Sequence, residues 1–176
     1  MLVAAADPAS VRAVPRGGDA ARWHRPLPAD PVAGPVAGAD AAAVATTNAL
    51  VALSLVNGGI LWSFPCAPSG VPLAADEDRI ACTTAGGEVL LLDWRGRLLL
   101  RVKGALPGLP PMLCGDKVLV CKEGAIHLAD AATRQEVRWL ATAWMGALAA
   151  PPVLADGNVY FATADKGLVC ARQGKR

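Results

Sequence analysis

Histidine, charged side chains and aromatic side chains are scarce in this sequence of 176 residues. It has two histidines, 18% charged residues and 5% aromatic residues. The 17 basic residues are nearly balanced by 15 acidic ones, and the net charge of +2 is far from the concentrated positive charge that binds phosphate. This composition argues against nucleic acid as a partner.

No recognisable catalytic or metal-binding set is present either. Neither His24 nor His127 has a metal triad or a nucleophile, base and acid set around it in the sequence. The acidic run Asp76-Glu77-Asp78 lacks the spaced oxygens of a calcium loop and is typical of a solvated turn. The pairs Gly58-Gly59 and Gly86-Gly87 fall in expected hairpin turns, not between a strand and a helix that could bind phosphate. We expect no catalytic residue, metal or cofactor in this chain, which argues against an enzyme.

Cysteine pairs are also missing. The five cysteines form no C-x-x-C pair and have no histidine at zinc spacing, so we expect reduced, buried thiols that act as small apolar side chains. The segment Met1 to Asp7 has no basic start, and its apolar run is too short for a signal peptide. Both features predict a cytoplasmic protein. The cysteines are Cys66, Cys82, Cys114, Cys121 and Cys170.

One long stretch lacks charge altogether, the 35 residues from Ala41 to Ala75. A stretch of this length could be taken for a membrane helix. It is interrupted by asparagine, glycine and proline at the places where other parts of the sequence also turn, and a helix of apolar residues does not tolerate that spacing. We expect no membrane span.

A repeat of about forty residues organises the whole sequence. Pro35, Pro72, Pro111 and Pro152 follow one another at steps of 37, 39 and 41 residues, and Trp23 and Trp62 are 39 residues apart. Each copy consists of short apolar segments separated by glycine or aspartate turns, which is typical of antiparallel strands. A repeat of this length built from strands predicts the blades of a β-propeller.

The copies predict one all-β domain over residues 1–176, an incomplete propeller of about four and a half four-stranded antiparallel blades. Such an arc would leave strand edges and apolar blade faces uncovered, so we expect a protein partner or a second copy to complete it. The expected units are a partial blade at 1–28, blades at about 34–66, 71–104 and 110–141, and a partial blade at 150–176.

The fourth copy of the repeat, in which the last strand is missing, resembles the pyrroloquinoline-quinone-like propeller repeat. It runs from Pro152 to Cys170 and contains Ala155-Asp156-Gly157, Val159-Tyr160 and Thr163, which match the consensus turn and strand positions of that family. Departures include Lys166 before the second glycine and the missing tryptophan in the copy at 71–104. The resemblance implies a propeller, and it does not fix a function, because the family ranges from enzymes to structural members.

The resemblance leaves three functions open. The family includes quinoprotein dehydrogenases, a lipoprotein of the outer-membrane barrel assembly machinery, and propellers at the C-terminus of acyl-adenylating enzymes. The chain has no adjacent cysteines of the kind that the dehydrogenase resemblance would imply. We therefore expect a non-catalytic module for protein interaction or assembly; the alternative is the C-terminal propeller segment of an intracellular acyl-adenylating enzyme, and a quinoprotein fragment fits less well.

Tryptophan offers the only candidates for a partner surface. Trp23, Trp62 and Trp139 recur at one repeat position, so they are expected to pack between neighbouring blades. Trp94 and Trp144 stand outside that position in expected loops, where they could either anchor the loop or contact a partner. The possible partner contacts are Trp94, Arg95, Trp144 and Met145.

Overall fold

The protein is built from strands, which form five antiparallel sheets. The computed structural model describes residues 1–6, 8–15, 20–156 and 158–172. Within these residues 18 strands follow one another, and we number the sheets 1 to 5 in chain order. They are sheet 1 with β1 (Leu2–Ala6), β2 (Ala9–Ala13) and β3 (Trp23–Pro26); sheet 2 with β4 (Pro31–Ala37), β5 (Ala41–Thr46), β6 (Ala49–Ser54) and β7 (Ile60–Pro65); sheet 3 with β8 (Ala74–Ala75), β9 (Arg79–Thr83), β10 (Glu88–Asp93) and β11 (Leu98–Lys103); sheet 4 with β12 (Met112–Cys114), β13 (Lys117–Lys122), β14 (Ala125–Asp130) and β15 (Glu136–Ala141); and sheet 5 with β16 (Val153–Ala155), β17 (Asn158–Thr163) and β18 (Gly167–Arg172).

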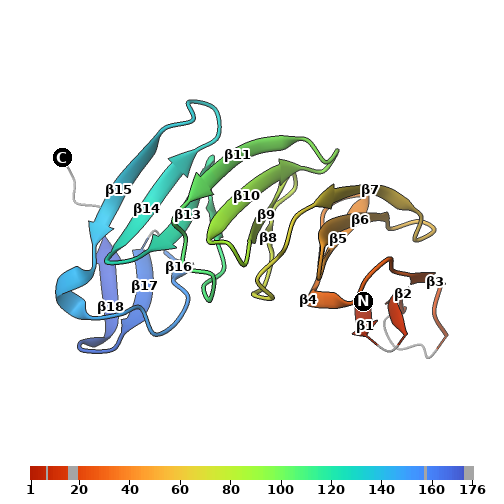
Figure 1. Ribbon diagram of the computed structural model, residues 1–176, viewed down its shortest axis with the longest axis horizontal. Coiled ribbons are helices and arrows are strands. Elements are labelled where there is room, and N and C mark those ends of the chain that lie inside the picture. The colour runs from red at the N-terminus through yellow and green to blue at the C-terminus, as the bar shows by residue number, and fades with distance from the viewer. Residues whose placement is uncertain (7, 16–19, 157, 173–176) are drawn as a thin grey trace.

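Each sheet is a meander, in which strands that are consecutive in sequence are hydrogen-bonded neighbours. The sheets stand side by side along an open arc, with the N- and C-termini at its opposite ends (Figure 1). Sheets 2, 3 and 4 have four strands each, while sheets 1 and 5 have three in the described residues. The predicted fold class, an incomplete all-β propeller of about four and a half blades, is confirmed. Parts of the expected end blades, at 7, 16–19, 157 and 173–176, lie outside the described residues, including Gly157 of the expected Asp156-Gly157 turn.

The inner strand of sheet 2 begins earlier than expected, at Pro31 instead of near residue 34. Its pairing with β5 shifts register between Pro31 and Ala33 and again between Ala33 and Val36. Proline has no N–H to give to a ladder of hydrogen bonds, so a strand with Pro31 and Pro35 cannot pair regularly along its length.

The interior strands of sheets 2, 3 and 4 are buried on both faces because each of these sheets lies between two others. All six residues of β5 are buried. Successive side chains of a strand point to opposite faces; accordingly Val44 belongs to the core between sheets 1 and 2, and Ala43 and Ala45 belong to the core between sheets 2 and 3. Two further cores join sheets 3 and 4 and sheets 4 and 5. This double burial explains why the strands are uninterrupted apolar runs instead of alternating patterns.

The fourth, outer strand of a blade can carry a tryptophan that contacts a turn of the following blade, as in β3 and β7. The Nε1 of Trp23 donates a hydrogen bond to the carbonyl of Leu55 at 3.0 Å, and a Cβ on Gly58 would lie 2.4 Å from the Trp23 ring. Trp62 repeats this contact one blade later, donating to the carbonyl of Trp94 at 2.9 Å with its ring against Gly96. The glycines at these turns are therefore needed because only a residue without a side chain leaves room for the indole. The expected packing role of the recurring tryptophans is confirmed.

The interface between sheets 3 and 4 lacks both the tryptophan and the turn glycine. Its outer strand β11 has no tryptophan, and the β14–β15 turn that follows in sheet 4 has no glycine. That turn instead places Arg134 at φ 56°, a conformation that glycine adopts more readily. The tryptophan and the turn glycine are thus present together or absent together at these three interfaces. Trp139 packs into the core between sheets 4 and 5, and residues 173–176, which follow β18, lie outside the described residues.

Aspartates at the ends of strands close the turns. Asp130, the last residue of β14, accepts hydrogen bonds from the backbone N–H of Ala132 at 2.8 Å and of Thr133 at 2.9 Å. Its other oxygen accepts from Nζ of Lys117 at 3.0 Å. The hydrogen bonds from the backbone N–H of Thr133 and from the side chain of Lys117 lower the pKa of Asp130 to about 2. Asp93, at the same place in β10, holds its turn in the same way.

Asp130→Asn is expected to remove part of the acid sensitivity of the fold. The pKa of Asp130 is lower in the folded chain than the ~3.9 of an unfolded chain, so its contribution to stability is present above pH ~4 and is lost as the pH falls towards ~2. Urea unfolding between pH 7 and pH 2 should show a smaller loss of stability for the variant. Asp116→Asn is the matched control, because Asp116 also pairs with Lys117 but its side chain is 76% exposed. An equal acid loss in Asp130→Asn and the parent chain would contradict the assignment.

Candidate interaction surface

Sheet 5 has one face that packs on sheet 4 and one that no described element covers. On the packed side, Val159 and Phe161 are buried and Val169 and Ala171 join the same core. The alternate residues point the other way and belong to none of the four cores. Five of them form what we call the uncovered face, while Ala155 and the buried Asn158 lie on the same side at its margin. The uncovered face consists of Val153, Tyr160, Ala162, Leu168 and Cys170.

The uncovered face is apolar and accessible. Val153 pairs across the sheet with Tyr160, which pairs with Cys170, and Ala162 pairs with Leu168. The Val153 side chain is 58% exposed and that of Leu168 is 76% exposed. Side chains opposite one another on adjacent strands share a face, so these five form one patch.

The same positions in sheet 4 show how such a face packs when another blade covers it. The strand pairings of sheet 4 repeat those of sheet 5, so each residue of the uncovered face has a counterpart in sheet 4. Every counterpart packs in the core against sheet 5. The uncovered face is therefore a blade-packing surface without a blade on it. The counterparts are Met112, Leu119, Cys121, Ile126 and Leu128.

The free edge of sheet 5 has the composition of an interior strand. In the described residues β18 pairs with β17 alone, while its counterpart β14 pairs on both sides. Outer strands of the other sheets carry charge or proline, such as Arg101 in β11, Glu136 in β15 and Pro65 in β7, which discourage pairing with other chains. β18 has one such residue, Arg172 at its end, and neither charge nor proline from Gly167 to Ala171.

The opposite end of the arc is more polar. Val3, Arg12 and His24 lie on the face of sheet 1 that points away from sheet 2, as their pairing shows. Arg12 and His24 are exposed. The two ends of the arc therefore differ in chemistry, one being apolar and the other carrying cationic or polar groups.

The predicted contact residues are divided between surface and core. Trp144 lies in the short 3-10 helix η1 (Ala143–Met145) and is 68% exposed, whereas the neighbouring Met145 is 1% exposed and belongs to the core between sheets 4 and 5. Trp94 is half-buried, its Nε1 donates to the carbonyl of Asp76 at 2.9 Å, and its ring fills the space beside Gly38. Trp94 thus anchors its loop. A contact role for the exposed Trp144 and Arg95 stays a prediction.

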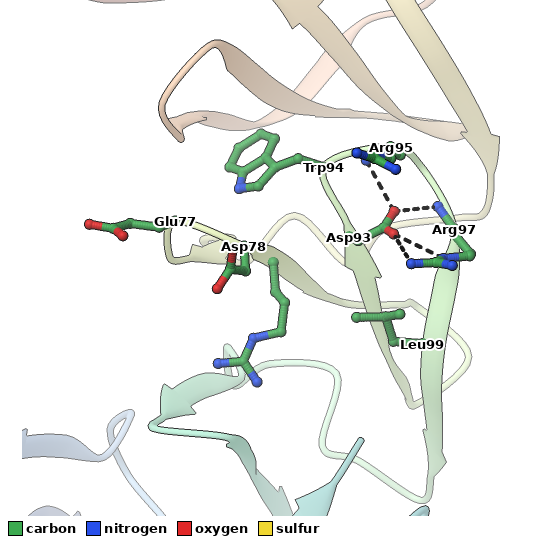
Figure 2. Close-up of a pocket in the computed structure, with 8 residues that line it drawn as sticks. Glu77, Asp78, Asp93, Trp94, Arg95, Arg97 and Leu99 are labelled. Atoms are coloured by element: carbon green, nitrogen blue, oxygen red, sulfur yellow. Dashed lines mark hydrogen bonds and ion pairs between the residues drawn. The ribbon is translucent and has the colours of Figure 1, made fainter. Parts of the chain in front are cut away.

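Figure 2 shows the hollow beside Trp94, with Arg95 and the pair Asp93 and Arg97 on one side and Glu77 and Asp78 on the other. The carboxylate of Asp93 accepts from the backbone N–H of Arg95 and Arg97 and pairs with the Arg97 side chain at 2.9 Å. Burial alone would raise the pKa of Asp93, but the hydrogen bonds from Arg97 outweigh it and the pKa is lowered. The carboxylate of Asp93 is therefore occupied by the turn and by its ion pair, and is not free to act as a base in catalysis.

The two histidines lie in different sheets, His24 in β3 of sheet 1 and His127 in β14 of sheet 4. His127 in β14 has Nδ1 2.5 Å from Oε1 of Glu136, which also pairs with Lys122, so the three form a cross-strand polar cluster at the rim of sheet 4. In the described residues no three or more histidine, cysteine, aspartate or glutamate side chains gather as a possible metal site. Across the same residues, no helix is long and apolar enough to cross a membrane.

The expectation that all five cysteines are buried is wrong for Cys170, which is exposed because the face on which it lies is uncovered. The other four are buried or half-buried, and all five thiols are free. Burial raises the pKa of Cys121 to about 12, as expected for a thiol that serves as an apolar side chain.

Comparison with known proteins supports the fold. No family model and no curated protein matches the sequence. The structure is similar to that of BamB from Moraxella catarrhalis, with a TM-score of 0.72 and 20% sequence identity over 92% of this chain and 52% of that chain. It is also similar to the computationally designed Ika4 protein, with a TM-score of 0.64 and 11% identity over 84% of this chain and 94% of that chain. The chain therefore spans about half the length of BamB, and what it shares with both is the β-propeller fold.

Proposed function

We propose that this chain is a non-catalytic interaction module of the pyrroloquinoline-quinone-like propeller type, which assembles with a protein partner or a second copy through sheet 5. The observation that carries the proposal is the uncovered face, whose sheet 4 counterparts all pack against a neighbouring blade. Burying such a face removes apolar surface from water, which drives association.

The rest of the described chain supports a structural role. The Asp93 carboxylate in the hollow beside Trp94 is used in a turn and an ion pair, and His127 lies against Glu136. The cysteines are free thiols, which supports our proposal of a cytoplasmic location, since a reducing compartment keeps thiols unpaired.

The purified chain is expected to associate at micromolar concentration into species larger than its 18.0 kDa monomer. Leu168→Glu should return it to the monomer, because a carboxylate at a position now 76% exposed would have to lose its water when the face is covered. Leu61→Glu is the matched control, since Leu61 is 53% exposed on β7 of sheet 2, away from the uncovered face. Sedimentation velocity measures the species present. If the purified parent chain stays monomeric and no protein partner binds to it, the proposed function is refuted.

A further inference from the structure

We infer that the edge of β18 receives a fourth strand from another polypeptide, paired antiparallel and bearing a large aromatic side chain that lies on the uncovered face. The inference rests on the proposed function and names the class of partner: an extended segment rather than a folded surface. Its three supports are the backbone of β18, the side chains of β18 and the outer strands of the other sheets.

The first support is the pairing of third strands. In sheets 2, 3 and 4 the third strands β6, β10 and β14 are each hydrogen-bonded on both sides, to the second and to the fourth strand. β18 occupies the third place in sheet 5 and is paired on one side within the described residues. The described outer strands β3, β7, β11 and β15 are all engaged in their own sheets, so an added strand would come from outside the described residues.

The second support is the lack of edge protection. Leu168 and Cys170 are exposed on an edge strand whose one charged residue, Arg172, is its last, and which has no proline. Natural proteins avoid such edges because they recruit other strands. An extended peptide can pair with an edge of this kind through its backbone and use pockets on the sheet for alternate side chains.

The third support gives the chemistry of the added strand. Trp23, Trp62 and Trp139 all stand on outer strands and all lie on the side of their sheet that faces the next blade. In sheet 5 that side is the uncovered face. A tryptophan at the same place of an added strand would therefore lie beside Leu168 on the uncovered face. Burial of its indole ring against this apolar patch would favour binding.

A direct probe is a fluorescent peptide with the sequence of residues 133–142, which contains β15 and its tryptophan. Fluorescence anisotropy with the full chain is expected to show saturable binding. A peptide with alanine in place of that tryptophan should bind at least about tenfold more weakly, because an aromatic anchor dominates such interfaces. Two N-methylated peptides test the pairing itself: methyl groups on alternate residues block one backbone edge each, so one peptide should lose binding and the other should keep it.

Binding must also be located on β18. Amide exchange in β18 and alkylation of the Cys170 thiol should slow when the peptide is bound, and Leu168→Glu should abolish binding while Leu61→Glu does not. Equal binding of both N-methylated peptides, or no binding at all, would overturn the inference. If Leu168-dependent self-association persists in that case, the proposed function stands and the face is covered by a second copy; if it is also missing, both fail.

Discussion

Gly58→Ala is expected to destabilise the chain by about 3 kcal/mol, far more than most surface substitutions. Two costs add at this position. The backbone of Gly58 has φ +69°, where a side chain is strained, and an added Cβ would lie 2.4 Å from the Trp23 ring. The indole cannot retreat without leaving the core between sheets 1 and 2 or giving up its hydrogen bond to Leu55.

Gly115→Ala separates these two costs. Gly115 has φ +58°, but a Cβ there would meet no atom within 4 Å, so this variant should lose only about 1 kcal/mol. Urea unfolding of both variants gives the difference. In a Trp23→Ala background the additional cost of Gly58→Ala should disappear, because the atom that it strikes is gone. Equal losses in the two glycine variants would mean that the tryptophan contact does not constrain the turn.

The architecture could be predicted from sequence because each turn and each tryptophan has a local chemical signature. Glycine and aspartate mark the hairpins, and the spacing of Trp23 and Trp62 marks the blade. The sequence did not predict that the tryptophan of one blade and the turn glycine of the following blade are present together or absent together. It depends on a contact between residues more than thirty positions apart, such as Trp62 and Gly96, which is set by how two blades pack.

The uncovered apolar face of sheet 5 agrees with what was expected of an incomplete arc, and which residues contact a partner stays a prediction. An arc with uncovered ends follows from counting strands, whereas the prediction of individual contacts relied on tryptophans outside the repeat. Trp94 is held by Asp76 and Met145 lies in a core, because loops of a propeller pack on their neighbours. Leu168 and Cys170 were overlooked because in the sequence they look like ordinary interior residues of a strand.

Ala45 and Ala162 allow a matched comparison of a covered blade face with the uncovered face, because they occupy the same place in two sheets. Each precedes the threonine whose hydroxyl accepts a backbone hydrogen bond in the hairpin between the second and third strands, Thr46 in sheet 2 and Thr163 in sheet 5. Ala45 is fully buried against sheet 3. Ala162 points to the uncovered face and is half-buried.

Ala45→Asp is expected to cost about 4 kcal/mol or more, since its carboxyl group would be buried among apolar side chains of two sheets with no partner. Ala162→Asp should change the unfolding free energy of the single chain by no more than about 0.5 kcal/mol, because water reaches its carboxylate. The second variant should instead lose self-association, since a covered face would bury the charge. Urea unfolding and sedimentation velocity measure the two effects separately. A large loss of stability in both variants would show that the face of sheet 5 is already buried within one chain, and unchanged association in Ala162→Asp would show that the interface lies elsewhere.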